Sequence, residues 1–326
     1  MDIDVFPPQE LDTVLRVLRT ALEPEAPLDA RERAFLDTYA LITAHPLPPG
    51  DPAPIDAREV RIGNAHARKR LVQLAAVAAL LSCPLKPGSV AFVRELSRAI
   101  GTRDGVVDVL AALLQGRTGR VRFLAMRRGM RAMLKEAWFS EGLRGVLRYV
   151  AALALKAPVN RDQHQRFRRL GLLPEGTLGR AYWTLMTEQG FGFPGEPGGI
   201  PATLVYHDLG HVLAGHAATP LGEIQQGSFQ AGNRREDGFF FLQFVLLQFH
   251  HGIRITPATP GVTGQFDPRR VLWAIHRGAK CPIDMTHGWD FWPLMNLSLD
   301  EARAQCGLLP PLPPFQQPRA ADLMAA

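Results

Sequence analysis

The residues of this chain best suited to chemistry are two histidines and two carboxylates, His207, Asp208, His211 and Glu223. On an α-helix, with about 100° per residue, His211 lies about 40° around the axis from His207, and Asp208 about 100° around it. These three side chains therefore share about a quarter of the helix circumference. Imidazole and carboxylate groups are ligands of divalent metals, so the spacing predicts one metal site on this face.

Glu223 can join that site only if the chain reverses after His211, because a continuous helix would place it about 18 Å further along the axis. Residues 219–222 supply turn chemistry, since Pro220 disfavours helix continuation and Gly222 permits a reversal. We therefore expect Glu223 to open a second helix, with its carboxylate at the positive end of the helix dipole. The set fits Zn, Fe, Co or Mn and leaves a position open for water or a substrate oxygen.

A plainer interpretation of the same residues has no metal. His207 and Asp208 would form a hydrogen-bonded pair near a helix start, and Glu223 would only cap its helix. The combination of a His–Asp doublet, a second His and a Glu after a turn favours the metal site. His216 lies half a turn off the predicted ligand face, so we expect it to support a ligand or to lie at the surface.

The pattern H-D-x-x-H-x11-E resembles the signature of the coenzyme Q (ubiquinone) biosynthesis protein 4 family. The resemblance covers about residues 140–312: it includes LPEGTLGRAY at 173–182, continues through Ile224, and extends loosely to Trp289, Trp292 and residues 299–310. It implies a helical, membrane-associated protein that holds a long polyprenyl lipid. It also implies oxidative decarboxylation at the ring carbon that bears the carboxylate of a quinone precursor, and a role in holding the biosynthetic complex together.

Under this resemblance the four metal ligands His207, Asp208, His211 and Glu223 are also the catalytic residues. The expected partners are a polyprenyl quinone intermediate, an anionic membrane surface and other quinone-biosynthesis proteins, with a second copy of the chain as a further candidate. The sequence does not identify the isoprenoid that is made, so a related quinone precursor fits equally well.

A second resemblance is to the HD-domain phosphohydrolases that cleave deoxynucleoside triphosphates, through His207-Asp208-Leu209-Gly210-His211 and Gly215-His216. Those enzymes take another metal ligand from an upstream His and one from a distant Asp. His164 and either Asp237 or Asp267 are the candidates in this chain. Residues 190–201, however, hold five Gly and three Pro, so no long helix leads into the motif. The Pro-Phe usual after the second His is also absent.

Composition predicts a globular all-α fold. The chain has 326 residues, 46% of them hydrophobic, and period-two runs of β-branched residues are almost missing. The three cysteines, Cys83, Cys281 and Cys306, are odd in number and far apart, which indicates a reducing compartment and buried thiols. The acidic start is not a signal sequence, and the apolar runs 71–81 and 239–249 are too short to span a bilayer. We expect a cytoplasmic protein peripherally associated with the inner membrane face.

Two regions and a tail are predicted. Residues 1–140 form a helical module with a faint similarity to the tellurite-resistance TerB-like domain, residues 141–315 form a helical metal- and lipid-binding domain, and residues 316–326 form a flexible tail. In the first module we expect helices over residues 11–22, after the Asp29–Glu32 capping box, and at about 58–82 and 87–100, with Gly101 as a C-cap.

Two further segments suggest lipid contact. From Arg117 to Lys156 there are ten Lys or Arg residues against two Glu, interleaved with Phe, Met and Leu, which is typical of a helix on an anionic membrane. A solvated helix face over the core is the other interpretation. We expect no nucleic-acid partner, because the net charge of +6 gives only unspecific attraction and no nucleic-acid module is visible.

Residues 239–249 are apolar nearly all round, which predicts a buried helix or the lining of a slot for a polyprenyl tail. His250 and His251 end that helix, where either imidazole could act as an acid or a base. A third functional class is a non-catalytic lipid-binding scaffold, in which a metal serves only to fix two helices.

Overall fold

The computed structural model has the predicted all-α fold. It describes residues 1–131, 160–197, 199, 205–255, 259–286 and 288–311, and these ranges contain no β-strand, only two isolated bridges. The domain boundary expected near residue 140 and the tail at 316–326 lie outside the described residues.

The first module consists of short helices joined by tight turns. Asp29 and Glu32 form the predicted capping box at the start of the second helix, and Gly101, with φ +64°, follows the end of the fourth. The third helix begins later than expected, because Asn64 accepts from the backbone N–H of Ala67 and so fixes the first turn there. The elements are α1 (Pro8–Leu22), α2 (Ala30–Thr43), η1 (Ala57–Glu59), α3 (Ala65–Ala79), α4 (Pro87–Ala99) and α5 (Val106–Leu114).

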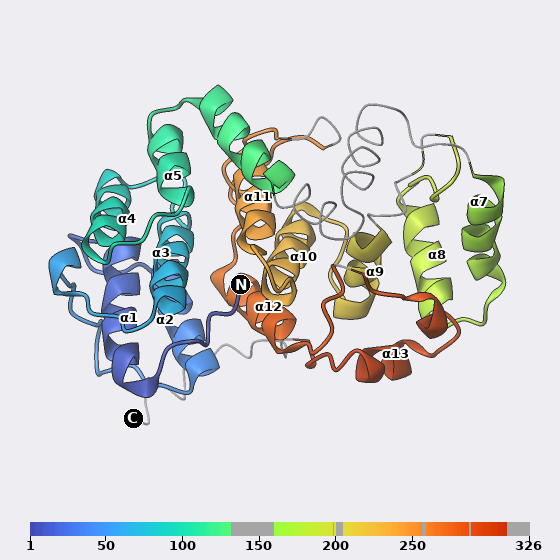
Figure 1. Cartoon of the computed structure of the whole chain (residues 1–326), viewed down its shortest axis with the longest axis horizontal. Coiled ribbons are helices and arrows are strands. Elements are labelled where there is room, and N and C mark those ends of the chain that lie inside the picture. The colour runs from blue at the N-terminus through green and yellow to red at the C-terminus, as the bar shows by residue number, and fades with distance from the viewer. Residues whose placement is uncertain (132–159, 198, 200–204, 256–258, 287, 312–326) are drawn as a thin grey trace.

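The second half is also helical, and its helices carry most of the sequence motifs. They are α7 (Arg161–Arg168), η2 (Arg169–Leu172), α8 (Leu178–Glu188), α9 (Val205–Ala214), α10 (Pro220–Asn233), α11 (Phe239–Phe249), α12 (Pro268–Lys280), η4 (Trp292–Leu294) and α13 (Leu299–Gln305). In Figure 1, α10, α11 and α12 lie between the first module and the group formed by α7, α8, α9 and α13.

One apolar core runs from the first module into α10–α12. Buried side chains of α1–α4 form a single cluster with residues such as Ile224, Leu246 and Ile275. The aromatic α11 is largely buried, as the sequence predicted. Its C-terminal end is tied to the end of α3, because the ring N–H groups of His250 and His251 donate to backbone carbonyls there, at 3.0 Å each. The two halves therefore share their main core.

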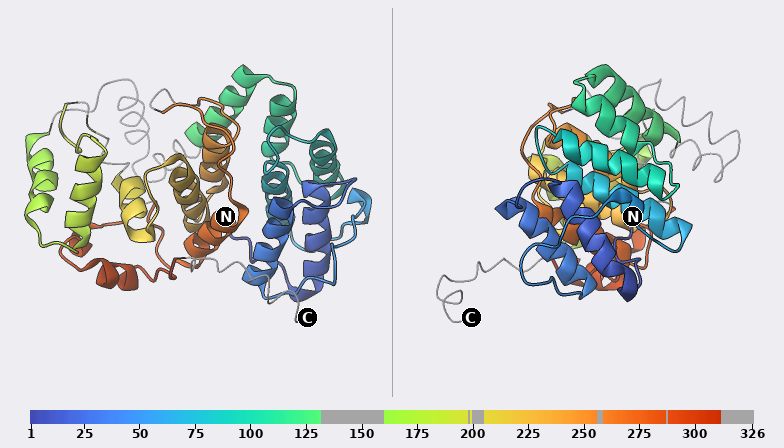
Figure 2. Two further views of the ribbon diagram at one scale, coloured as in Figure 1. Left: turned by 180° about the vertical axis from the view of Figure 1, so that it is seen from behind. Right: turned by 90° about the vertical axis from the view of Figure 1, so that its left-hand side faces the viewer.

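A second apolar cluster lies on the other side of α10. It joins α7, α8, α9 and α13 through residues such as Tyr182, Leu209 and Ala302, and it includes Phe229 of α10. Helix α10 thus contributes to both clusters, with Ile224 in one and Phe229 in the other. The view from behind in Figure 2 shows the same order of helices, with α10 between α9 and the first module.

The cysteine prediction was partly wrong. Cys281 and Cys306 are buried free thiols, and the Cys281 thiol donates to the carbonyl of Cys306 at 3.2 Å. Cys83, in contrast, is exposed, because it lies in the short turn between α3 and α4 rather than on an inward helix face. Among the described residues, no helix has both the length and the apolar character needed to cross a membrane.

Candidate metal centre

Helices α9 and α10 bring three of the four predicted ligands to one point. The Nε2 atoms of His207 and His211 lie 3.3 Å apart, and the Glu223 carboxylate oxygens lie 3.3 Å and 3.4 Å from them, respectively. These are the one group of His, Cys, Asp or Glu side chains in the described ranges arranged to hold a metal ion. Two ligands about 2.1 Å from a tetrahedral metal are about 3.4 Å apart, so all three separations fit such an ion.

The other nitrogen of each imidazole is already used. His207 Nδ1 faces the side-chain oxygen of Gln230 at 3.1 Å, and His211 Nδ1 faces the backbone carbonyl of His216 at 3.0 Å. Both oxygens can only accept, so each Nδ1 carries the proton and donates it. Both Nε2 atoms therefore face Glu223, where a bound metal ion would take the place of the proton that His207 shares with this carboxylate. Histidine ligands usually have such a supporting acceptor at the other ring nitrogen.

The turn between the two helices is built differently from the prediction. Gly215, with φ +73°, ends α9, so the reversal occurs there and not at Gly222. Thr219 caps α10 and Pro220 occupies its first turn. Gly222 lies inside α10, where an added Cβ would stand 1.7 Å from the carbonyl oxygen of Ala217. Its lack of a side chain lets α10 start close against the loop, and Glu223 follows in the first turn, as expected.

A polar layer between α9 and α10 supports the ligands. His216 is buried, and its Nδ1 lies 3.0 Å from the side-chain oxygen of Gln226. The amide nitrogen of Gln226 fills the space beside Gly210, where a Cβ would come within 2.0 Å of it. The sequence left open whether His216 supports a ligand or lies at the surface. It supports His211, through its backbone carbonyl.

The electrostatics of the group favour a cation. Burial lowers the pKa of His207, but the hydrogen bond and the negative charge of Glu223 outweigh it and raise this pKa to about 9. Burial raises the pKa of Glu223, and the two neighbouring imidazoles lower it more strongly, so the carboxylate remains ionised. Positive charge is therefore stabilised between these side chains. His211 is 3% exposed, whereas His207 and Glu223 are 30% and 26% exposed, so one side of the group faces solvent.

Asp208, the fourth predicted ligand, does not join the compact group formed by the other three. Asp208 follows His207 on α9, so its side chain leaves the helix about 100° around the axis from that of His207. Burial raises the pKa of its carboxyl. The charge of Asp208 also contributes to raising the pKa of Tyr182, after burial, which places the Tyr182 side chain in the field of this carboxylate. The Tyr182 hydroxyl is buried and has no hydrogen-bond partner among the residues that the structure describes, and sequence reasoning did not identify it.

The residues needed for the phosphohydrolase site are engaged elsewhere. His164 Nδ1 lies 3.2 Å from the Glu196 carboxylate. Asp237 pairs with Arg128 at 2.9 Å, and Asp267 caps α12. None of the three belongs to the metal-type group. His250 has both ring nitrogens in hydrogen bonds to backbone groups, which gives it a structural role.

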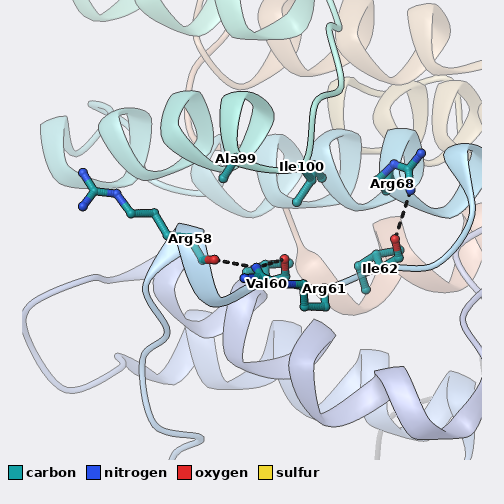
Figure 3. Close-up of a pocket in the computed structure, with 7 residues that line it drawn as sticks. All are labelled: Arg58, Val60, Arg61, Ile62, Arg68, Ala99 and Ile100. Atoms are coloured by element: carbon teal, nitrogen blue, oxygen red, sulfur yellow. Dashed lines mark hydrogen bonds between the residues drawn. The ribbon is translucent and has the colours of Figure 1, made fainter.

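Two of the cavities on the described surface are large enough to hold a small molecule, and no predicted ligand lines either of them. One, of about 400 Å³, lies between the start of α2 and residues 264–269. The other, of about 410 Å³, lies between η1 and the end of α4 (Figure 3). Two of its arginines, Arg61 and Arg68, already donate to backbone carbonyls nearby. Comparisons with protein-family models and with curated proteins found no match for the chain.

Proposed function

We propose that His207, His211 and Glu223 hold a divalent metal ion, and that the protein acts on or holds a polyprenylated aromatic intermediate of isoprenoid quinone biosynthesis. The reaction proposed for this site is the oxidative decarboxylation of that ring. The observation that carries the metal assignment is the close approach of the two Nε2 atoms, 3.3 Å apart, with one Glu223 carboxylate oxygen 3.3 Å from His207 and the other 3.4 Å from His211. The assignment of the substrate rests on the resemblance of the motif and of residues 173–182 and 299–310 to the coenzyme Q biosynthesis protein 4 family.

The donor set supports Zn, Fe, Co or Mn and leaves at least one coordination position for an exogenous ligand. When bound, such an ion supplies Lewis acidity toward a phenolate or carboxylate oxygen and, if it is redox-active, one-electron chemistry with dioxygen. The solvent-facing side of His207 and Glu223 is where a substrate would approach. Gln230 and the His216 carbonyl keep both imidazoles in the ligating tautomer. Asp208, which lies in the electrostatic field of His207, His211 and Glu223 and has a raised pKa, is the group available to accept a proton.

The test begins with metal content. Wild-type protein, Glu223→Ala and His164→Ala are purified alike, and their metals are measured by inductively coupled plasma mass spectrometry. We expect wild type and His164→Ala to hold one equivalent of the same metal and Glu223→Ala to hold little. His164 is a suitable control because it is also part of a His–Glu pair, at 3.2 Å, on a different helix. Loss of metal only in His164→Ala would support the phosphohydrolase interpretation instead.

The second step separates an enzyme from a scaffold. A polyprenylated aromatic carboxylate is incubated aerobically with each protein, and loss of carbon dioxide from the ring is followed by mass spectrometry. Turnover in wild type and in His164→Ala, but not in Glu223→Ala, supports the proposed reaction. If the metal is bound but no protein turns over the carboxylate, and Glu223→Ala still restores quinone synthesis in a deletion strain, the metal only fixes α9 to α10 and the protein is a lipid-binding scaffold.

A further inference from the structure

The helix formed by residues 118–131 has apolar side chains on two opposite faces. Its inner face is accounted for by the fold. Val121 is buried in a cluster with Leu247 and Ile253, and Gly129 stands against the ring of Phe240. In Figure 1 this helix, drawn in green, runs from the end of α5 toward α11. The inner apolar residues therefore belong to the core.

Ion pairs also fix the orientation of this helix. Arg128 Nη1 lies 2.6 Å from the buried Asp104 carboxylate, and its Nη2 lies 2.9 Å from Asp237. The guanidinium also stands over the ring of Phe239, 4.9 Å from its centre. A pair of this kind, largely shielded from water, holds its partners in one geometry. The face opposite Arg128 is thus held outward.

The outward face carries three large apolar side chains that the fold does not bury. Phe123, Met126 and Met130 are 61%, 51% and 45% exposed. Their spacing of three and four residues puts them within about 60° of one another around the helix axis. We call these three residues the outer apolar stripe. Single exposed apolar residues are ordinary, but three in a row on one helix face indicate a surface that contacts something apolar.

Arginines border the stripe on both sides. Arg120, Arg127 and Arg131 lie about 40–80° from Phe123 in one direction, and Arg122 lies about 100° away in the other. All four are exposed. The sequence has no acidic residue between Asp108 and Glu136, so the negative charge that could neutralise them locally is missing from this part of the chain. The face combines an apolar centre with a cationic border.

We propose that this face docks on an anionic lipid bilayer, with the outer apolar stripe in the interface and the arginines on lipid phosphates. The pattern is that of helices that lie in the plane of a membrane surface, and the long arginine side chains can reach the head groups. A second copy of the same face would bring arginine against arginine, which like-charge repulsion opposes. A nucleic acid would satisfy the arginines and leave the two methionines without an apolar partner. The remainder of the basic stretch predicted from sequence, residues 132–156, lies outside the described residues.

The proposal is tested with the full chain and two kinds of vesicle, phosphatidylcholine alone and phosphatidylcholine mixed with phosphatidylglycerol, in a co-sedimentation assay. One variant replaces the stripe (Phe123→Ser, Met126→Ser, Met130→Ser). Its control replaces two exposed leucines elsewhere, Leu41→Ser and Leu172→Ser, which are 63% and 85% exposed.

A second variant, Arg120→Gln, Arg127→Gln, Arg131→Gln, removes three charges from the border. Its control removes the same number of exposed charges near the end of α4, as Arg94→Gln, Arg98→Gln, Arg103→Gln. Thermal melting and metal content of every variant are measured alongside, so that a folding defect or a failed metal site is recognised separately from a loss of docking.

We expect wild type to bind the anionic vesicles and to bind phosphatidylcholine weakly. Each border arginine contributes about fivefold near an anionic surface, so the border variant should lose about a hundredfold in affinity. The stripe variant should lose at least about tenfold, while both controls bind like wild type. Equal binding by the stripe variant and its control would overturn the proposal. The proposal would also be overturned if wild type were a dimer in sedimentation and the stripe variant were a monomer. Binding of wild type to single-stranded DNA but to no vesicle would overturn it too.

Discussion

The close approach of α10 to the preceding loop gives a sharp test of the metal site, through Gly222→Ala. The added methyl group would stand 1.7 Å from the carbonyl oxygen of Ala217, whereas ordinary contacts begin near 3.4 Å. Both atoms at the clash are anchored to backbone, so the chain must yield by about 1.7 Å, and Glu223 is the next residue. Metal–ligand bonds tolerate about 0.2 Å. We therefore expect metal affinity to fall at least about a hundredfold, with overpacking that costs about 1–3 kcal/mol of stability.

Gly119→Ala is the matched control, because Gly119 is also near the start of a helix and its added methyl group meets no atom within 4 Å. That variant should be as stable as wild type, or more stable by up to about 1 kcal/mol. Affinity is measured by competition with a chromophoric chelator, and stability by urea denaturation of the metal-free proteins. If Gly222→Ala binds metal as tightly as Gly119→Ala does, then Glu223 is not a ligand or the loop is softer than its contacts indicate, and the reasoning fails.

Three further changes test the surroundings. Gln230→Leu removes the acceptor that holds the His207 tautomer and should weaken metal binding about 10–100-fold without changing stoichiometry; unchanged affinity in the chelator assay would contradict this role. Arg128→Leu strands the buried Asp104 carboxylate and should cost about 3–5 kcal/mol in urea denaturation at neutral pH. Burial lowers the pKa of His251 to about 4 from 6.5. The stability this neutral imidazole provides is complete above pH 6.5 and is lost as the pH falls toward 4, because the unfolded chain binds the proton more readily. Relative to His251→Gln, wild type should therefore lose about 1.3 kcal/mol between pH 7.5 and 5.5, and a difference that is the same at both pH values would refute it.

The site was predictable as far as local rules reach. The spacing of His207 and His211 predicts a shared helix face. Pro220 indicates that the first helix ends before Glu223, so these three ligands could be named from sequence. Asp208 also lay within the predicted ligand face, but its side chain is rotated about 100° around the axis of α9 from that of His207. Only the placement of α10 shows which side of α9 faces Glu223. Gly215 ends α9 with a positive φ, and Gly222 allows a close backbone contact at the start of α10. Neither the φ angle nor the contact can be read from the sequence.

The fold shows the same limit. The Asp29–Glu32 capping box gave the start of α2, because a cap acts within one turn. The second ligand helix was expected to open at Glu223, whereas α10 begins at Pro220 and is capped by Thr219. The apolar run of α11 predicted burial but not its neighbours, and the contacts of His250 and His251 with the end of α3 join residues about 170 positions apart. Likewise, the hydroxyl of Tyr182, which has no partner within the described ranges, becomes notable only when its burial is known. Pairings of that range depend on the whole packing arrangement, which no local pattern encodes.

The shared core has a consequence for biosynthesis of the chain. Helices α1–α4 emerge from the ribosome first, but the cluster they form is completed by side chains from Ile224 to Ile275. Between the end of α4 at Ala99 and Ile224 about 124 residues must be translated, which takes roughly 6–25 s at 5–20 residues per second. During that interval the apolar surface that α10–α12 later cover is exposed on a nascent chain. We expect this surface to engage a chaperone co-translationally, and to be released only when α12 has left the exit tunnel.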